Sequence, residues 1–392
     1  MVRTVLSGLF LACSWCWCIG MFFPVLMVRD FGWWGWVAFL VPNCLGAMMV
    51  GLIHRRGGAA ARLIERHRRA AVAFSVVTIL FHVSFLCWFV PTMLARHGIG
   101  RWAALGMVGV VVAMSVVVGR WWGRSRVWLW CGAGVFAVSV LCGVMAGVTG
   151  GEGTSFPVAP SGGGRFGRMS LAFLAPTVAL GFLTCPHLDL TFLRVRRELE
   201  GRAGSGAFVI GFAMFFPVLM VMTLLYATRM AEGIACTYIV AHVMVQAWFT
   251  MGAHFRELMA EDGALRRSGR ARWDGAGAFV FLCVVVSAVS VWALGAEPIG
   301  GMTATELVYK MFITAYGVVF PAYIWIVMVP RRGVLPGVQV MLLSCVIVVL
   351  PFAQVGYLGE RWAWSLGIPG VILVWPWVGR LLEHRAPSKE HK

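Results

Sequence analysis

Few polar side chains interrupt the long apolar runs of this 392-residue chain. Ionisable and hydrogen-bonding groups are costly within such runs, so each one is a candidate for binding a solute or an ion. The candidates for solute binding are Ser14, Asn43, His82, Thr184, Cys185, Pro186, His187, His242 and Gln246. Thr250 and Asp189 are the candidates for ion coupling. No metal site is expected, because no further soft ligands follow the Cys13-x-x-Cys16 pair at a suitable spacing.

The densest group of candidates lies at 184–189, where Pro186 stands among polar residues. Proline removes a backbone hydrogen bond and interrupts a helix, which frees carbonyl and amide groups to hold a solute or an ion. A simple proline kink would account for the same residues, so both interpretations stay open.

Other polar residues have simpler explanations. Glu306 and Lys310 are four residues apart and can pair with each other on one helix. His242 and Gln246 share a helix face and can form hydrogen bonds between helices, worth about 1 kcal/mol each. His82 can be a packing histidine as readily as a ligand. These alternatives compete with solute binding at each position.

The elements that carry these residues are predicted from composition and apolar runs. Hydrophobic residues make up 60% of the chain and charged residues 12%, with a mean hydropathy of +0.83, which a soluble core cannot accommodate. Since about 20 apolar residues span a bilayer, the chain is predicted to be an all-α polytopic membrane protein forming a single transmembrane domain over 1–392. The expected spans are 4–27, 33–53, 70–92, 102–119, 127–149, 169–190, 206–228, 233–253, 275–295, 306–329, 334–354 and 362–380.

The distribution of charge predicts the orientation of these twelve spans. With the N-terminus in the cytoplasm, the inner loops and termini hold 25 of the 33 basic residues. Short loops rich in Lys and Arg stay cytoplasmic, so both termini are expected there. The basic clusters at 55–69, 120–126, 194–202 and 256–272 are expected to meet anionic lipid headgroups. Nucleic-acid binding is not expected, because no stacking aromatic residues are interleaved with these charges.

The first ten spans divide into two sets of five. The first set covers 4–149, an external connector rich in Gly, Pro and Ser covers 150–168, the second set covers 169–329, and two additional helices follow over 334–380. Because each set has an odd number of spans, the two sets run in opposite directions through the membrane. Many secondary transporters are built from such inverted repeats.

The sixth span contains Gly181, Pro186, His187 and Phe192, and basic residues follow at 194–197. This pattern resembles the corresponding core helix of the sodium/solute symporter family, whereas Thr191 stands where that family has an arginine. The resemblance covers residues 181–193 and implies a LeuT-type inverted-repeat fold. The resemblance also implies a sodium ion held by carbonyls of a broken first helix and by two adjacent hydroxyl residues on the eighth helix. Here Thr250 supplies one such hydroxyl, and the residues on either side of it have none.

These features predict a secondary transporter of an unidentified small solute, working by alternating access in the cell membrane, a bacterial inner membrane. No cofactor is expected, and the coupling ion would be Na⁺ or H⁺, the latter through His82, His187 or His242. Two alternatives remain. One is a membrane enzyme, a lipid-linked sugar or acyl transferase with Asp30 as its acid. The other is a sensor or assembly subunit that keeps a transporter-like shell without transporting.

Overall fold

The chain forms helices and no strands in the part that the structure describes. The computed structural model describes residues 1–121, 125–149, 164–227, 233–259, 271–330 and 336–385. Within them, eight helices are long and apolar enough to cross a membrane: Cys18–Ile53, Ala59–His97, Arg101–Trp121, Arg126–Val148, Arg168–Leu188, Gly201–Leu225, Ala304–Met328 and Gly337–Leu358. The prediction of an all-α protein with membrane-spanning helices is confirmed at this level.

The first expected span is two helices. α1 covers Val2–Trp15 and α2 covers Cys18–Ile53, so the chain leaves helical geometry inside the run expected to be continuous over 4–27. The boundary expected at 28–32 is present, because the backbone leaves helical geometry at Gly32, with φ of 66° and ψ of −155°, and a second helical stretch follows this kink. Glycine adopts this left-handed conformation without the steric penalty of a side chain, which explains why the bend falls at this residue.

The next three helices complete the first half. They are α3 (Ala59–Leu94), α4 (Arg101–Trp121) and α5 (Ser125–Val148). α3 begins at Ala59, before the expected 70–92, but its backbone is non-helical at His67, with φ of −118° and ψ of 25°. The basic turns before this kink therefore form a short helix ahead of the expected span. α4 and α5 expose many apolar side chains, Val110, Met114 and Leu141 among them. Exposed apolar faces of this kind suit a lipid environment better than water.

The second half begins with another interrupted helix. α6 covers Arg168–Thr184, a short 3₁₀ turn covers Cys185–Leu188, and α7 covers Leu190–Glu198. The following helices are α8 (Gly201–Ile210), α9 (Phe216–Ala227), α10 (Gly233–Met259) and α11 (Ala271–Ala293). Most of the expected connector over 150–168 lies outside the described residues.

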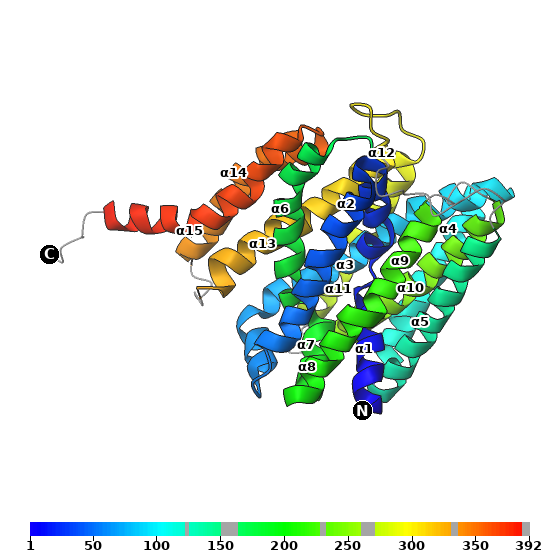
Figure 1. The fold of residues 1–392 in the computed structure, drawn as a ribbon, viewed down its shortest axis with the longest axis horizontal. Helices are drawn as coiled ribbons and strands as arrows, with labels where there is room; N and C mark the ends of the chain where they lie inside the picture. Colours follow the sequence, from blue (N-terminus) through cyan, green and yellow to red (C-terminus); the bar gives the residue numbers. More distant parts are fainter. Residues whose placement is uncertain (122–124, 150–163, 228–232, 260–270, 331–335, 386–392) are drawn as a thin grey trace.

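The C-terminal helices form a smaller apolar cluster of their own. α12 (Ala304–Thr314) continues through π-helical turns and α13 (Phe320–Tyr323) to Met328, and α14 (Pro336–Phe352) and α15 (Gly367–Arg385) follow. Ile326, Cys345 and Ile372 belong to this cluster, which is separate from the main core. Figure 1 shows α14 and α15 at the edge of the bundle opposite α4 and α5.

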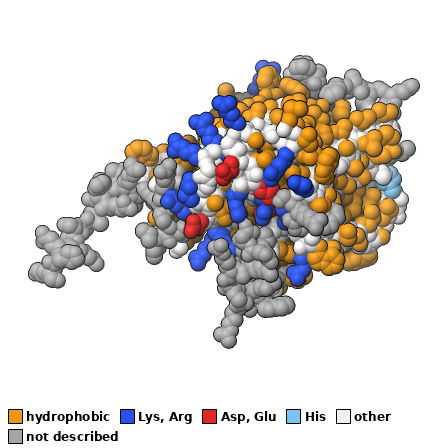
Figure 2. Space-filling model, turned by 90° about the horizontal axis from the view of Figure 1, so that it is seen from below, with side chains coloured by type: hydrophobic (Ala, Val, Ile, Leu, Met, Phe, Trp, Pro, Cys, Tyr) orange, Lys and Arg blue, Asp and Glu red, His pale blue; other side chains and the backbone are white. Residues whose placement is uncertain are grey.

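Basic side chains gather at one end of the bundle. Figure 2, which looks at the end where the N-terminus lies, shows Lys and Arg side chains clustered beside apolar surface. Arg55, Arg56, Arg62, Arg66 and Arg202 are exposed. Such an arrangement is typical of a membrane protein whose cytoplasmic face carries its positive charge.

Candidate functional site

The first helix is interrupted at Cys16 and Trp17, where Trp17 has extended backbone with φ of −74° and ψ of 175°. Neither residue is proline or glycine, so contacts with other helices must hold this break. The backbone N–H of Cys18 donates to Nε2 of His82 at 3.3 Å, and the Cys18 carbonyl accepts from the Tyr309 hydroxyl at 3.1 Å. Backbone groups freed by the break are therefore satisfied inside the protein, as a site away from water requires.

His82 serves this break as a neutral cap. Its Nδ1 lies 2.8 Å from the carbonyl oxygen of Thr78, which can only accept, so Nδ1 carries the proton. Nε2 is then an acceptor, which matches the donated N–H of Cys18. Both ring nitrogens of His82 are therefore engaged in hydrogen bonds to backbone groups. His82 stabilises the broken helix and does not line the cavity described below.

The second interruption lies between α6 and α7. Pro186 is in the 3₁₀ turn and Asp189 is extended, with φ of −73° and ψ of 114°. Asp189 is the N-cap of α7, because its Oδ1 accepts from the backbone N–H groups of Thr191 at 2.7 Å and Phe192 at 3.4 Å. A side-chain N-cap of this kind stabilises a helix by about 1 kcal/mol. The break predicted from Pro186 thus exists, and Asp189 restarts the helix after it.

The two interruptions meet in space. The Thr191 hydroxyl donates to Oγ of Ser14 at 3.3 Å, and the rings of Trp15 and Phe192 lie 4.9 Å apart. Two polar candidates from distant parts of the sequence, Ser14 and Asp189, are therefore at one junction. Thr191, which departs from the symporter pattern, is the residue that connects them.

A cavity of about 60 Å³ lies beside this junction, with room for roughly four to six water molecules. Its lining is mostly apolar and contains no Asp, Glu, Lys or Arg: Trp15, Trp17, Ile19, Gly20, Phe23, Asn43, Leu174, Thr177, Val178, Gly181, Phe182, Cys185, Ile313, Thr314, Tyr316, Gly317, Val318, Ala353, Tyr357 and Ile368. Both helix breaks contribute, through Trp17 and Cys185. Of the predicted solute-binding residues, Asn43 and Cys185 line this cavity.

Several polar groups of the lining are already partnered within the protein, whereas the buried Tyr357 hydroxyl has no hydrogen-bond partner among the described residues. Oδ1 of Asn43 accepts from the indole N–H of Trp15 at 2.5 Å. The hydroxyls of Thr177 and Thr314 donate to backbone carbonyls at 2.9 and 3.1 Å. Cys185 Sγ donates to a carbonyl at 3.2 Å. The cavity therefore offers an uncharged, largely apolar surface with few directional contacts.

Three predicted residues of α10 lie away from this cavity. Nε2 of Gln246 donates to Oγ of Ser139 on α5 at 2.8 Å, and the Thr250 hydroxyl donates to the carbonyl of Cys13 on α1 at 3.3 Å. His242 is buried on the same helix. These contacts join α10 to its neighbours, which is the interhelical role weighed for this helix.

His187 and Thr184 also point away from the cavity lining. Nδ1 of His187 lies 3.0 Å from Nε2 of His54, which follows the last residue of α2. The Thr184 hydroxyl donates to the carbonyl of Leu180, one turn back on α6, at 2.7 Å. The histidine pair ties the turn after α6 to the end of α2, while Thr184 satisfies its hydroxyl locally.

The histidine pair predicts a pH dependence of stability. Burial, and then the nearby Arg196 guanidinium, lower the pKa of His54 from 6.5 to about 4. The unfolded chain then binds a proton more readily than the folded one, so stability is present above pH 6.5 and is lost as pH falls through about 4. We expect His54→Gln to flatten this part of the pH profile of the thermal midpoint in detergent. Identical pH slopes for the two proteins would contradict this assignment.

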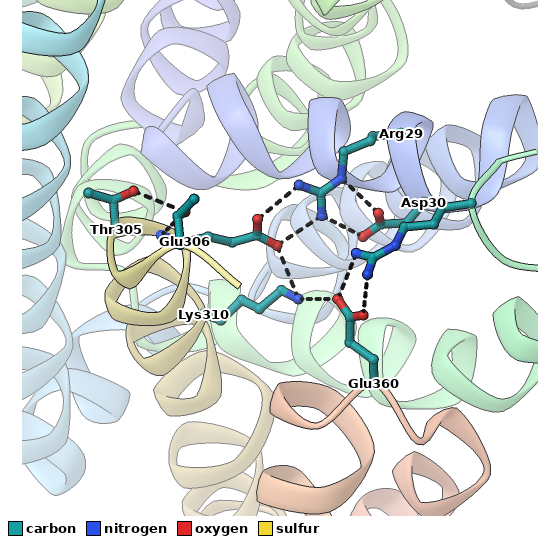
Figure 3. A network of polar contacts seen from close by, with 8 residues as sticks. Arg29, Asp30, Thr305, Glu306, Lys310 and Glu360 are labelled. Atoms are coloured by element: carbon teal, nitrogen blue, oxygen red, sulfur yellow. Dashed lines mark hydrogen bonds and ion pairs between the residues drawn. The ribbon is translucent and has the colours of Figure 1, made fainter. Parts of the chain in front are cut away.

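A group of six ionised side chains, the outer charged cluster, lies at the end of the bundle away from the basic face. Its members are Arg29, Asp30, Arg165, Glu306, Lys310 and Glu360. Figure 3 shows five of these side chains converging from α2, α12 and the turn after α14, and the sixth, Arg165, in the segment before α6, lies 3.1 Å from Glu360. With three cations and three carboxylates, the cluster is neutral as a whole.

Arg29 organises one side of the cluster. Its Nη1 and Nη2 donate to the two carboxylate oxygens of Glu306 at 2.9 and 2.8 Å. Its Nε and Nη2 also donate to the oxygens of Asp30 at 2.7 and 3.0 Å. Both oxygens of Asp30, the acid considered for an enzyme, are therefore bound to a guanidinium group. Such bidentate pairs are among the stronger charged contacts.

Lys310 holds the other side. Its Nζ lies 3.2 Å from Glu306 and 3.2 Å from Glu360, and its side chain is only 2% exposed. The predicted pairing with Glu306 is present but is one contact of several. Nζ also lies 5.6 Å from the ring centroid of Tyr357, which lines the cavity. The cluster therefore borders the cavity lining through Tyr357.

A second set of charges, the inner charged cluster, connects α1, α7 and α10. Arg194 donates to Glu257, and Arg194 and Arg256 lie 3.6 and 4.0 Å from Glu198. Arg3, near the start of α1, lies 3.7 Å from Glu198. α1 and α7 thus join charged contacts at one end of the bundle. α2 and the segment before α6 join the outer charged cluster at the other end.

No protein-family model matches this chain, and no characterised protein matches it at a significant level.

His254 is a residue of the junction that the sequence did not single out. The eighth span was expected to end at 253, whereas α10 continues to Met259 and buries His254 completely. Its Nδ1 lies 3.0 Å from Oγ of Ser75, and its ring lies 5.9 Å from that of Trp17. The available signal was its spacing of one helical turn from Thr250, on the same face of the helix.

Proposed function

We propose that this chain is a secondary transporter that carries a small uncharged solute across the cell membrane by alternating access. The observation that carries the proposal is a single cavity lined by residues of both interrupted helices, Trp17 and Cys185. Broken helices are tolerated at membrane depth where they line a cavity or are buried in protein, and transporters use them to bind solutes.

The position of the breaks also supports the proposal. Each lies in the first member of one of the two expected sets of five helices, as a LeuT-type inverted repeat with both termini in the cytoplasm requires. The resemblance of residues 181–193 to the sodium/solute symporter family leads to the same fold. The charged clusters at the two ends of the bundle are suited to serve as its gates, because ionic contacts can form and break between two states.

The chemistry of the cavity indicates the kind of solute. No ionised side chain lines it, so a solute with net charge would lose its hydration without gaining a counter-charge. Asn43, Thr314 and Cys185 offer polar contacts that would have to rearrange to reach a solute. A small neutral solute with a large apolar fraction fits this surface best.

Uptake into proteoliposomes with a pooled panel of neutral metabolites tests the proposal, and Gly317→Leu provides the blocking variant. A Cβ atom at Gly317 would meet only Cγ2 of Thr177, at 3.7 Å, so a larger side chain can enter the cavity without striking the backbone. We expect this variant to fold and to lose uptake.

Gly134→Leu is the matched control, because Gly134 lies on α5 with no atom within 4 Å of an added Cβ. It should keep full uptake. Absence of uptake or counterflow for every solute, under proton and sodium gradients alike, would overturn the proposed function. Equal uptake by the two variants would show that the cavity is not the pathway.

A further inference from the structure

Asp189 and His254 present unpartnered polar atoms to each other at the junction of the two breaks. Oδ1 of Asp189 caps α7, but Oδ2 has no hydrogen-bond partner among the described residues, and neither has Nε2 of His254. The two atoms are 4.0 Å apart, and both side chains are fully buried. An unmade hydrogen bond at such a position costs about 1–3 kcal/mol per group.

One proton satisfies both atoms. A proton on Nε2 can be donated to Oδ2, or a proton on Oδ2 to Nε2, after a small closing movement. Without it, Asp189 is an ionised carboxylate in a buried site with no positive partner in contact, which is unfavourable. A sodium ion fits less well, because Na⁺ prefers oxygen ligands and one of the facing atoms is an imidazole nitrogen.

His254 can exchange its proton, whereas His82 cannot. The Ser75 hydroxyl both donates and accepts, so it accommodates either state of Nδ1 in His254. The partner of Nδ1 in His82 is a carbonyl, which fixes one tautomer. Of the two buried histidines near the breaks, only His254 has a free ring nitrogen directed at an acid.

The pair contacts both interrupted helices of the proposed transporter. Thr191 links Asp189 to α1, and Trp17 of the first break packs on the His254 ring.

The titratable groups that face the pair are Glu257 on α10, His82 on α3 and Tyr316 after α12. Arg194 on α7 binds Glu257. Glu257 is bound by Arg194, and His82 is a neutral cap, so neither competes for this proton.

We propose that Asp189 and His254 bind one shared proton and that this proton is the coupling ion. The proton enters from water on one side when the junction is open, binds Oδ2 or Nε2, and leaves to water on the other side, with no other bond made or broken. Closure favours the protonated pair, because it buries no net charge there. The transport role rests on the proposed function, whereas proton binding by the pair does not.

Infrared difference spectra of the protein in lipid nanodiscs between high and low pH test proton binding without any solute. Samples with isotopically labelled aspartate or histidine report a change of charge on either partner. We expect one transition that disappears in Asp189→Asn and moves to lower pH by about one unit or more in His254→Gln, because the imidazolium contact is lost. Ser75→Ala provides a milder variant that should move the transition the same way.

Glu257→Gln is the control for a neighbouring acid: the aspartate-labelled transition should persist, shifted only to lower pH, because a nearby negative charge is removed. A labelled signal that persists unchanged in Asp189→Asn, or that neither His254→Gln nor Ser75→Ala moves, overturns the shared proton. In proteoliposomes, a proton gradient should drive uptake by the wild-type protein and not by Asp189→Asn. Uptake driven equally well without that gradient overturns the coupling role alone, while absence of all uptake counts against the proposed function and leaves the spectra to decide the proton site.

Discussion

Replacing Lys310 by methionine is expected to lower the free energy of unfolding by about 3–5 kcal/mol. The side chain of Lys310 is 2% exposed and lies between the carboxylates of Glu306 and Glu360. Methionine would fill most of the space but would leave these two carboxylates facing each other with one cation fewer. The thermal midpoint and a reversible denaturant titration in mixed micelles measure the loss.

The double variant Lys310→Met with Glu360→Gln separates charge from packing. It restores neutrality, because Arg29 and Arg165 then balance Asp30 and Glu306, and we expect it to recover much of the lost stability. Arg165→Gln is the control for an exposed member, since its side chain is 52% exposed, and it should cost no more than about 1 kcal/mol. Equal effects of Lys310→Met and Arg165→Gln would refute the role of burial.

Lys310→Met should also make the cavity accessible from water. Cys185 and Tyr357 both line the cavity, and Lys310 of the outer charged cluster lies 5.6 Å from the Tyr357 ring centroid. In a protein that keeps Cys185 as its only cysteine, Lys310→Met should raise labelling by a membrane-impermeant thiol reagent about tenfold or more, since each 1.4 kcal/mol changes an equilibrium tenfold. Unchanged labelling, together with lower stability, would show that the cluster is structural and not a gate.

The sequence predicted an all-α membrane protein correctly, because apolar runs of membrane length depend on composition alone; eight such helices lie in the described part of the chain. It also located the break at Pro186, where proline stands among polar residues. Prolines in more apolar surroundings, such as Pro91 and Pro176, lie inside helices that continue past them. A broken first helix was expected only from the resemblance to the symporter family, and the residues did not locate it at Cys16 and Trp17, because neither is a helix breaker. That break depends on the partners of Cys18, which are His82 and Tyr309, from α3 and α12.

Contacts between distant segments also explain which partners of the site residues could be predicted. Glu306 and Lys310 were visible as a pair because four residues on one helix are neighbours. Their other partners, Arg29 and Glu360, are more than 40 residues away in the sequence and meet them only in the folded chain. Local spacing reveals partners on one element, whereas partners on different elements require the packing of the helices.

Packing of this kind is tested most directly at Gly46, where α2 meets α6. A Cβ atom built there would lie 1.9 Å from the carbonyl oxygen of Phe182 and 2.7 Å from Cα of Leu183. Both are backbone atoms, so even Gly46→Ala must push the two helices apart. Small residues permit such close approach between membrane helices. We expect Gly46→Ala to destabilise the fold by about 1–3 kcal/mol and Gly46→Leu to abolish folded protein.

Gly109→Ala is the matched change on α4, where no atom lies within 4 Å of the added Cβ. Because alanine favours a helix by up to about 1 kcal/mol over glycine, this variant should be as stable as the wild type or more so. The opposite signs of the two glycine-to-alanine changes, measured by thermal midpoint, isolate the contact between α2 and α6. Phe182 also lines the cavity, so displacement of α6 in Gly46→Ala should reduce uptake as well as stability. If Gly46→Ala matched Gly109→Ala in both measurements, the close contact that positions the second break beside the cavity would be disproved.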